Sequence, residues 1–161
     1  MRLVIVSGQS GAGKTVALHT LEDDGFYCID NLPCALLPAL IEELNTSQNE
    51  VYRNVAVGID ARSPAESLSQ LPASLDALNA QDDMHAELLY LTTDTEELVK
   101  RFSETRRKHP LSLDGTPLLS AIESERRLLD TIRQSADLVI NTTKSNLHQL
   151  RQTLRTRLLK D

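Results

Sequence analysis

The chain has 161 residues, of which 40% are hydrophobic and 25% charged, and its formal net charge is −6. This composition is ordinary for one globular domain and excludes a disordered or collagen-like chain. Only 3% of the residues are aromatic, which argues against a surface that stacks several nucleic-acid bases. No apolar run approaches the roughly 20 residues that span a bilayer, and the N-terminus lacks a signal-peptide layout. We therefore expect a cytoplasmic protein without a membrane span.

Cysteine, histidine and charge patterns add smaller constraints. Cys28 and Cys34 are too few for a disulfide framework and form no CxxC pair, so they favour two partly buried thiols. The four histidines share no metal-ligand spacing, so we expect no zinc site. Residues 144–161 carry five Lys/Arg and one acidic residue, whereas the chain as a whole has a net negative charge. This asymmetry indicates a docking or anionic-partner surface near the C-terminal end.

The first predicted elements surround a glycine-rich segment. Residues 3–6 (Leu-Val-Ile-Val) are typical of a strand that is buried on both faces. A helix is expected from about Lys14, with Gly25 ending it as a left-handed cap. Residues 26–29 then predict a second strand, and a helix begins at Pro33 and runs to about residue 44. Phe26 and Tyr27 are interpreted as core residues rather than as base-stacking ones.

Residues 54–91 continue the alternation of strand and helix. Strands are expected at residues 54–59 and 87–91, where short apolar runs recur. Between them, Ser63 is the expected N-cap of a helix, with Pro64 at its first position and Glu66 completing a capping box. A comparable cap at Asp94 predicts a helix that extends to about residue 108.

The last third contains a loop, a strand and two helices. Residues 109–117 contain two prolines and a glycine and predict an irregular loop. A helix over about 117–134, a strand at 138–140 and a helix with one leucine face over 147–158 follow. Five strands separated by helices imply parallel βαβ crossovers. The expected fold is therefore one three-layer α/β domain over residues 1–161, with a five-stranded parallel sheet.

The glycine-rich segment carries the strongest functional signal. Residues 8–15 (Gly-Gln-Ser-Gly-Ala-Gly-Lys-Thr) match G-x-x-x-x-G-K-[ST] in full. Glycines let backbone N–H groups turn towards phosphate oxygens, and the next helix directs its positive end at them. Lys14 supplies a charge to the β and γ phosphates, and the Thr15 hydroxyl is placed to ligate Mg²⁺. We predict a nucleoside triphosphate site formed by Gly8, Gln9, Ser10, Gly11, Ala12, Gly13, Lys14 and Thr15.

Two acidic residues follow predicted strands and are candidates for the same site. Asp60 ends the run 55–59 and is the best second ligand for Mg²⁺, because parallel strands end at one edge of the sheet. Its alternative role is that of a solvated acid at the start of a turn. Asp30 could position a second substrate or act as a base, and capping the next helix is the alternative.

A basic cluster near residue 106 is the remaining catalytic candidate. Arg106 and Arg107 could stabilise charge on a transferring phosphoryl group; a solvated helix face is the alternative. Guanine specificity in many GTPases relies on an Asn-Lys-x-Asp segment after a late strand, and residues 141–144 (Asn-Thr-Thr-Lys) lack the Asp. The choice between ATP and GTP stays open at this stage.

Several longer segments carry a family resemblance. They are residues 4–15, residues 25–33 (Gly-Phe-Tyr-Cys-Ile-Asp-Asn-Leu-Pro), residues 105–111 (Thr-Arg-Arg-Lys-His-Pro-Leu) and residues 154–159. With them the sequence resembles, over its whole length, the RapZ/YvcJ family of bacterial P-loop nucleotide-binding proteins, one branch of which is known as RNase adapter proteins. The resemblance implies a kinase-like P-loop NTPase fold, binding of ATP or GTP with Mg²⁺, and weak hydrolysis. It also implies a second nucleotide contact at Asp60, Ala61, Arg62 and Ser63.

The resemblance also implies partners for the full-length family proteins. In the RNase-adapter branch they bind a small regulatory RNA and direct its cleavage by an endoribonuclease, which controls synthesis of glucosamine-6-phosphate synthase. RNA binding and homo-oligomerisation belong to a second domain, which we expect to be absent from this chain. Three functions remain open: a regulatory nucleotide-sensing module, a small-molecule or nucleoside kinase, and a structural domain with a vestigial loop.

Overall fold

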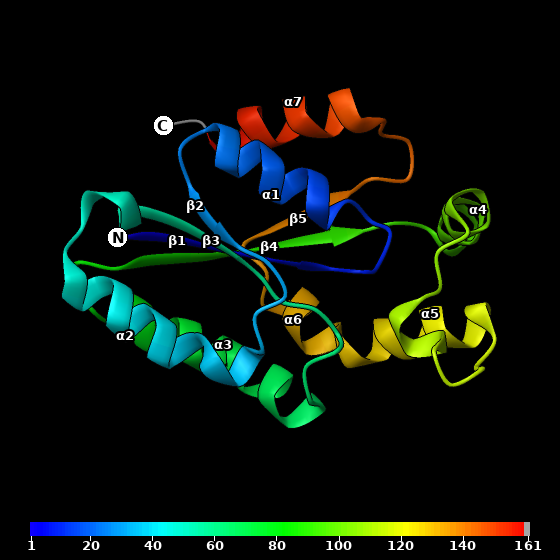
Figure 1. Ribbon diagram of the computed structural model, residues 1–161, viewed down its shortest axis with the longest axis horizontal. Helices are drawn as coiled ribbons and strands as arrows, with labels where there is room; N and C mark the ends of the chain where they lie inside the picture. The colour runs from blue at the N-terminus through cyan, green and yellow to red at the C-terminus, as the bar shows by residue number, and fades with distance from the viewer. Residues whose placement is uncertain (160–161) are drawn as a thin grey trace.

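A parallel sheet forms the centre of the computed structural model, which describes residues 1–159. Lys160 and Asp161, which belong to the basic C-terminal segment, lie outside the described residues. The strand order in the described part is β2-β3-β1-β4-β5, and all neighbouring strands are parallel (Figure 1). The strands are β1 (Arg2–Gly8), β2 (Tyr27–Ile29), β3 (Asn54–Gly58), β4 (His85–Thr92) and β5 (Leu138–Asn141).

The central position of β1 follows from its sequence. Successive side chains of a strand point to opposite faces, so an apolar run of this kind needs cover on both sides. Leu3 and Ile5 belong to one buried cluster, and Val4 and Val6 to the other. Helices on both faces supply that cover, which gives the three layers expected from the sequence.

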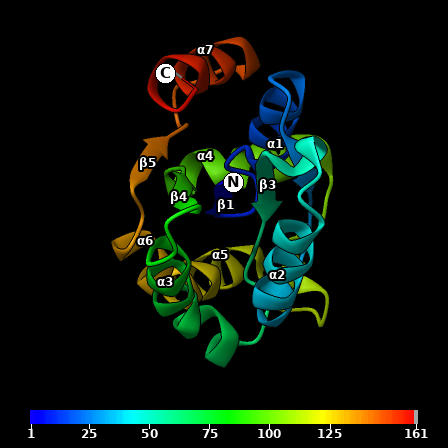
Figure 2. The ribbon, with the colours of Figure 1, turned by 90° about the vertical axis from the view of Figure 1, so that its left-hand side faces the viewer.

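The helices divide between the two faces and the carboxyl end of the sheet (Figures 1 and 2). One face is covered by α1 (Lys14–Asp23) and α7 (Leu147–Arg157). The other face is covered by α2 (Leu37–Ser47), α3 (Ala65–Asn79) and α6 (Asp130–Gln134). Towards the carboxyl ends of the strands lie α4 (Thr95–Thr105) and α5 (Leu118–Leu128). Among the described residues, no helix combines the length and the apolar character needed to cross a bilayer.

Two expected helix caps are wrong in detail. Helix α3 begins at Ala65 with Pro64 in the cap position, and no side chain caps it. Ser63 is not available, because its Oγ accepts a hydrogen bond from the Cys34 backbone N–H at 3.1 Å. Asp94 does occupy the cap position of α4, but its side chain makes no cap hydrogen bond.

Three helix boundaries also differ from the sequence expectation. A 3-10 turn over Cys34–Leu36 precedes α2, and Leu129 separates α5 from α6 with φ −94° and ψ 0°. Helix α4 ends at Thr105, three residues early, because Arg106 adopts a left-handed conformation with φ 54°. That reversal brings His109 back against Phe102, with the two ring centroids 5.3 Å apart. The end of α4 thus coincides with the chain reversal that buries His109.

Candidate functional site

The phosphate loop, residues 8–15, lies where β1 passes into α1. β1 lies between β3 and β4, and ligands of open α/β sheets bind at such a switch in strand order. The first bond of α1 runs from the Ala17 N–H to the Gly13 carbonyl at 3.0 Å. The N–H groups of Lys14, Thr15 and Val16 therefore project from the helix N-terminus. Such an end attracts anions, and phosphate in particular.

A cavity of about 450 Å³ opens beside the phosphate loop. It draws its walls from segments that are far apart in the sequence: the loop itself, the ends of β2 and β3, and the region that follows α4. Eight of the sequence-predicted residues line it, namely Ser10, Gly11, Lys14, Thr15, Asp30, Asp60, Arg62 and Arg107. The fold thus brings the predicted phosphate, metal and charge-stabilising residues to one place.

The Lys14 side chain folds back over the phosphate loop, where it makes one hydrogen bond. Its Nζ donates a hydrogen bond to the Gly8 carbonyl at 3.2 Å. Burial lowers the pKa of Lys14 below its ordinary value, and the nearby carboxylates of Asp60, Glu125 and Asp30 oppose this only in part. A further negative charge beside the ammonium would relieve that cost, which suits a phosphate ligand.

Asp60 follows directly after β3 and is fixed by Arg62. The Asp60 carboxylate accepts hydrogen bonds from the Arg62 backbone N–H at 2.9 Å and from Arg62 Nη2 at 2.7 Å. Burial acts to raise the pKa of Asp60, but the hydrogen bonds of Arg62 and the charge of Lys14 outweigh it and hold the pKa below its ordinary value. Asp60 is therefore an ionised carboxylate at neutral pH.

Asp30 reaches the cavity because Gly58 leaves room for it. A Cβ on Gly58 would lie 2.6 Å from Asp30 Oδ1. That oxygen accepts a hydrogen bond from the Asn31 backbone N–H at 2.7 Å, and the Asn31 side chain accepts one from Arg62. The ends of β2 and β3 are thereby joined across the cavity.

The other predicted residues do not present side chains to this cavity. Gln9 turns towards the end of β4, where its Oε1 accepts a hydrogen bond from the Thr93 N–H at 3.0 Å. Ala61 packs in the apolar core, and Ser63 binds the Cys34 backbone. The cavity lining also does not include Gly8, Ala12, Gly13 or Arg106. Ala12 is fully buried, and its carbonyl accepts a bond from the Thr142 hydroxyl at 2.7 Å.

Sequence reasoning missed a buried hydrogen-bond network behind the loop. Glu125 on α5 is 1% exposed and accepts hydrogen bonds from the Ser10 N–H at 2.8 Å and the Ser10 hydroxyl at 2.6 Å. His109 Nε2 lies 3.2 Å from Glu125 Oε1, and His109 Nδ1 accepts a bond from the Leu111 N–H. An accepting Nδ1 assigns the hydrogen to Nε2, which donates to Glu125. The spacing of Ala121, Ile122, Glu125 and Leu129 on one helical face was the available signal.

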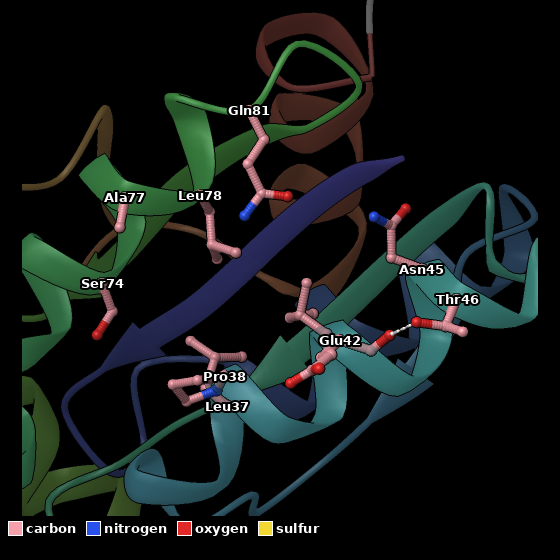
Figure 3. A pocket seen from close by; sticks show the side chains of 10 residues that line it. Leu37, Pro38, Glu42, Asn45, Thr46, Ser74, Ala77, Leu78 and Gln81 are labelled. Atoms are coloured by element: carbon pink, nitrogen blue, oxygen red, sulfur yellow. Dashed lines mark hydrogen bonds between the residues drawn. The ribbon is translucent and has the colours of Figure 1, made fainter.

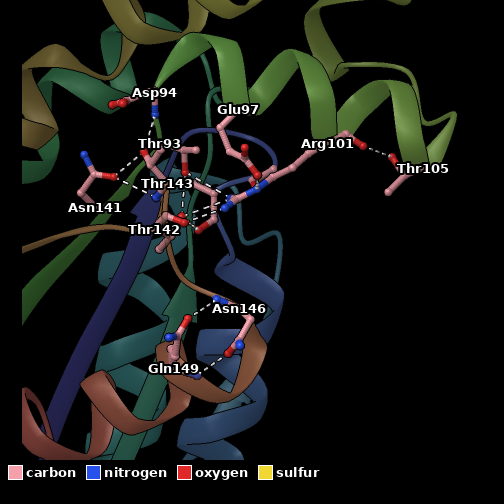
Figure 4. Close-up of polar contacts among 12 residues, drawn as sticks. Thr93, Asp94, Glu97, Arg101, Thr105, Asn141, Thr142, Thr143, Asn146 and Gln149 are labelled. Atoms are coloured by element: carbon pink, nitrogen blue, oxygen red, sulfur yellow. Dashed lines mark hydrogen bonds and ion pairs between the residues drawn. The ribbon is translucent and has the colours of Figure 1, made fainter.

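Arg101 fixes the phosphate loop from the side of α4 and β5 (Figure 4). Its Nη1 donates to the Gly11 carbonyl at 2.9 Å and its Nη2 to the Thr142 carbonyl at 2.6 Å. The Thr93 and Thr142 hydroxyls, 2.7 Å apart, continue this network. Arg101 thus connects three separate segments, those of Gly11, Thr93 and Thr142.

We expect Glu125→Gln to lower the free energy of unfolding by about 1–3 kcal/mol, because a neutral amide is a poorer acceptor for the two Ser10 donors. Urea unfolding followed by circular dichroism measures this. Glu123→Gln, an exposed position on the same helix, is the matched control and should change stability by about 0.5 kcal/mol or less. Equal stability of the two variants would contradict the structural role of the buried network.

The donor set of the cavity fits a magnesium ion bound with a nucleotide. The Thr15 hydroxyl and the Asp60 carboxylate line the same cavity, and both are oxygen ligands of the type that Mg²⁺ prefers. Within residues 1–159 no group of three or more His, Cys, Asp or Glu could hold a metal by itself. Mg²⁺ commonly takes one or two protein ligands and completes its shell with phosphates and water.

A second hollow lies between α2 and α3 (Figure 3). It has a volume of about 370 Å³, and its lining includes Leu37, Ile41 and Leu78 together with Glu42 and Gln81. None of the sequence-predicted site residues lines it. The cavity at the phosphate loop is therefore the better candidate for the functional site.

Solved structures with similar folds include two small-molecule kinases. Shikimate kinase from Bacteroides thetaiotaomicron superposes with a TM-score of 0.61 at 16% identity, covering 98% of each chain. A gluconokinase from Sinorhizobium meliloti gives a TM-score of 0.54 at 15% identity, covering 92% of this chain and 86% of that one. These likenesses establish the three-layer α/β fold of P-loop kinases, as the sequence predicted.

Relatives of higher identity are nucleotide-binding proteins by name. One from Pseudomonas fluorescens strain SBW25 is 52% identical over 159 residues, which are 99% of this chain and 55% of the relative. One from Alkalilimnicola ehrlichii is 49% identical over 161 residues, covering 100% of this chain and 56% of the relative. The chain thus spans about half the length of the curated relatives it matches. The model of the RapZ-like N-terminal domain matches residues 1–161, and the chain therefore belongs to the RapZ-like N-terminal domain family.

Proposed function

We propose that residues 1–161 form a nucleotide-binding domain, which takes the triphosphate of ATP or GTP with Mg²⁺ into the cavity at the phosphate loop. The observation that carries this proposal is the meeting of Lys14, Thr15 and Asp60 in one cavity at the N-terminus of α1. The names of the relatives, which describe nucleotide-binding proteins, support it.

In this proposal each residue has a distinct task. The projecting amides of Lys14 and Thr15 bind phosphate oxygens, and the Lys14 ammonium neutralises the β and γ phosphates. Thr15 and Asp60 would hold Mg²⁺, which supplies further neutralisation of the phosphate charge. Arg107 lines the same cavity from the exposed segment after α4 and would contact the terminal phosphate.

Slow hydrolysis fits the electrostatics of the site, which favours a regulatory module over an efficient enzyme. Asp60 is assigned to Mg²⁺ rather than to base catalysis, and its lowered pKa makes it a weak proton acceptor. A general base works best when its pKa lies near the working pH. We therefore infer that nucleotide binding, rather than turnover, is the main output of this domain.

A small-molecule or nucleoside kinase is the second candidate. Asp30 and Asn31 line the same cavity as Asp60, and in this alternative they would bind an acceptor hydroxyl. The likeness in fold to shikimate kinase and gluconokinase favours the same candidate. An acceptor screen separates the two: rapid ADP formation that depends on an added sugar, nucleoside or small alcohol would support the kinase and contradict the regulatory module.

Calorimetric titration with non-hydrolysable analogues of ATP and GTP, in Mg²⁺, tests the proposal directly. We expect saturable binding of at least one analogue and a matching rise in melting temperature, because a ligand of the folded state stabilises it by mass action. Absence of binding by both analogues would contradict the proposal and favour a vestigial loop.

The RNA-adapter role that the family resemblance implies would belong to the full-length proteins rather than to this domain alone. The small regulatory RNA, the endoribonuclease, homo-oligomerisation and control of glucosamine-6-phosphate synthase would involve the part of the relatives that this chain does not span. The net charge of −6 supports that division, because an acidic body disfavours RNA. The cytoplasmic location stays a prediction.

We expect Asp60→Asn to reduce the dependence of nucleotide binding on Mg²⁺, with a loss of about tenfold in Mg²⁺ affinity, the scale found when one ligand contact is weakened. The measurement compares triphosphate affinity over a Mg²⁺ titration and in EDTA. Asp76→Asn, an exposed carboxylate on α3, is the matched control. Superimposable Mg²⁺ titrations of the two variants would contradict the metal role of Asp60.

A further inference from the structure

A second polar cavity, of about 460 Å³, lies on another side of the phosphate loop. It is enclosed by the end of β4, the start of α4 and the α5–α6 segment, and it shares no lining residue with the nucleotide cavity. The buried side chains of Gln9 and Tyr90 contribute to its lining, together with charged side chains. Its lining includes Gln9, Tyr90, Thr95, Arg126 and Arg133, together with the carboxylates of Asp94 and Asp130.

Gln9 presents an unpaired donor to this cavity. The residue is 0% exposed, and its Oε1 accepts hydrogen bonds from the Thr93 N–H at 3.0 Å and the Thr92 hydroxyl at 2.8 Å. Because a backbone N–H can only donate, the oxygen must occupy that end of the amide. Gln9 Nε2 is buried and has no hydrogen-bond partner within residues 1–159. A buried donor left unpaired is costly, so an acceptor from a ligand would stabilise this arrangement.

Two arginines line the same cavity without strong partners. Arg126 Nη2 reaches the Thr93 carbonyl only at 3.5 Å. Among the described residues, no ion pair joins Arg126 or Arg133 to Asp94 or Asp130, although all four line the cavity. Asp130 instead accepts a bond from the Gln134 amide at 2.7 Å. The guanidinium groups therefore remain open to an anion from outside the chain.

The N-terminus of α4 adds backbone donors at Thr95. The first bond of α4 runs from the Leu98 N–H to the Asp94 carbonyl at 3.0 Å, and the Asp94 side chain makes no cap hydrogen bond. The N–H groups of the first turn thus project from the helix start, where the helix dipole favours negative charge. Burial, and to a smaller extent the charge of Glu125, raises the pKa of Tyr90 to about 12. Its hydroxyl therefore keeps its proton and remains a donor.

We propose that this cavity binds a small oxyanion, the carboxylate or phosphate group of a metabolite, through Gln9 Nε2, the N-terminus of α4 and the two arginines. The reason for choosing an oxyanion is that a buried amide, two guanidinium groups and the N–H groups at the start of α4 all offer hydrogen-bond donors here. Asp94 and Asp130 line the same cavity and oppose an anion, so the two arginines must outweigh them. Arginine is suited to either group because its planar fork matches both carboxylate and phosphate geometry. The site shares no lining residue with the nucleotide cavity, so the inference goes beyond the proposed function.

The side-chain NH₂ signal of Gln9 in ¹⁵N–¹H spectra reports on this site directly. The spectra are recorded while inorganic phosphate or acetate is titrated into the protein, and Gln9→Glu identifies the signal by its loss. A Lys14→Ala background is used to weaken phosphate binding at the nucleotide cavity. The two anions separate a phosphate site from a carboxylate site.

We expect a saturable shift of the Gln9 signal with at least one of the two anions. The double variant Arg126→Gln, Arg133→Gln should raise the half-saturating concentration about tenfold or more, as loss of charge-assisted hydrogen bonds implies. Arg127→Gln is the matched control, because it removes the same charge from an exposed neighbour that does not line the cavity. No saturable shift with either anion, or a shift that the double variant leaves unchanged, would overturn the proposal.

Discussion

Lys14→Ala is expected to weaken the binding of ATP and GTP by about 100-fold or more, since charge-assisted hydrogen bonds to two phosphate groups are lost. Calorimetric titration in Mg²⁺ measures the effect. The fold should persist, because burial lowers the pKa of Lys14 and its ammonium is therefore held at a cost in the free protein. We expect a change in unfolding free energy of about 1 kcal/mol or less.

The pH dependence of binding gives a second readout of Lys14. Its pKa lies below the ordinary lysine value, so the ammonium loses its proton at a lower pH than an exposed lysine does. Nucleotide affinity that depends on this charge should therefore decline as the pH rises through that pKa. A bound phosphate raises the pKa and moves the decline to higher pH. The Lys14→Ala variant should lack this decline.

Lys108→Ala is the matched control for this experiment. Lys108 lines the same cavity but is exposed to solvent, and an exposed charge contributes little because solvent screens it. We expect an affinity within about threefold of the unchanged protein. If Lys14→Ala binds as tightly as Lys108→Ala, Lys14 does not contact the triphosphate.

Local pattern was enough to predict the strands and the phosphate loop. The run Leu-Val-Ile-Val at residues 3–6 has to be buried on both faces, and a parallel sheet with two helical layers is what satisfies it. The G-x-x-x-x-G-K-[ST] pattern is similarly local, because eight consecutive residues form the loop and open α1. The fold class follows from these features together with the alternation of strand and helix.

Contacts between distant segments could not be predicted in this way. Ser10 and Glu125 are 115 positions apart, and no periodicity connects them. The segment 60–63, assigned as a unit to the nucleotide, is divided by its tight turn. Asp60 and Arg62 face the cavity, whereas Ala61 enters the core and Ser63 binds the Cys34 backbone. Side-chain direction in a turn depends on the neighbouring elements, which a single sequence does not specify.

The glycines of the loop have a reason in packing that the sequence did not reveal. The sequence pattern indicates only that these glycines let backbone N–H groups approach phosphate. A Cβ on Gly13 would lie 2.7 Å from Leu150 on α7, and one on Gly11 would lie 3.3 Å from both Leu98 and Phe102 on α4. The phosphate loop thus packs closely against α4 and α7, and this packing is possible because Gly11 and Gly13 have no side chains.

Gly8→Ala is expected to lower the free energy of unfolding by about 3 kcal/mol or more, through backbone strain and a steric clash together. Gly8 has φ 147°, and an added Cβ would overlap the Leu91 carbonyl oxygen and lie 2.8 Å from the Leu91 nitrogen. Leu91 belongs to the buried strand β4, paired with Gly8 in the sheet register, so its backbone cannot move aside without disturbing the sheet. Urea unfolding measures the loss.

Gly25→Ala separates the two causes of that loss. Gly25 also has a positive φ, 92°, but an added Cβ there would have no neighbour within 4 Å. The control therefore carries only a conformational penalty, about 1–2 kcal/mol, and the excess in Gly8→Ala measures the clash with β4 together with the greater strain of φ 147°. If both variants lose the same stability while Gly8→Ala alone loses triphosphate affinity, Gly8 serves phosphate approach rather than the packing of β1 on β4.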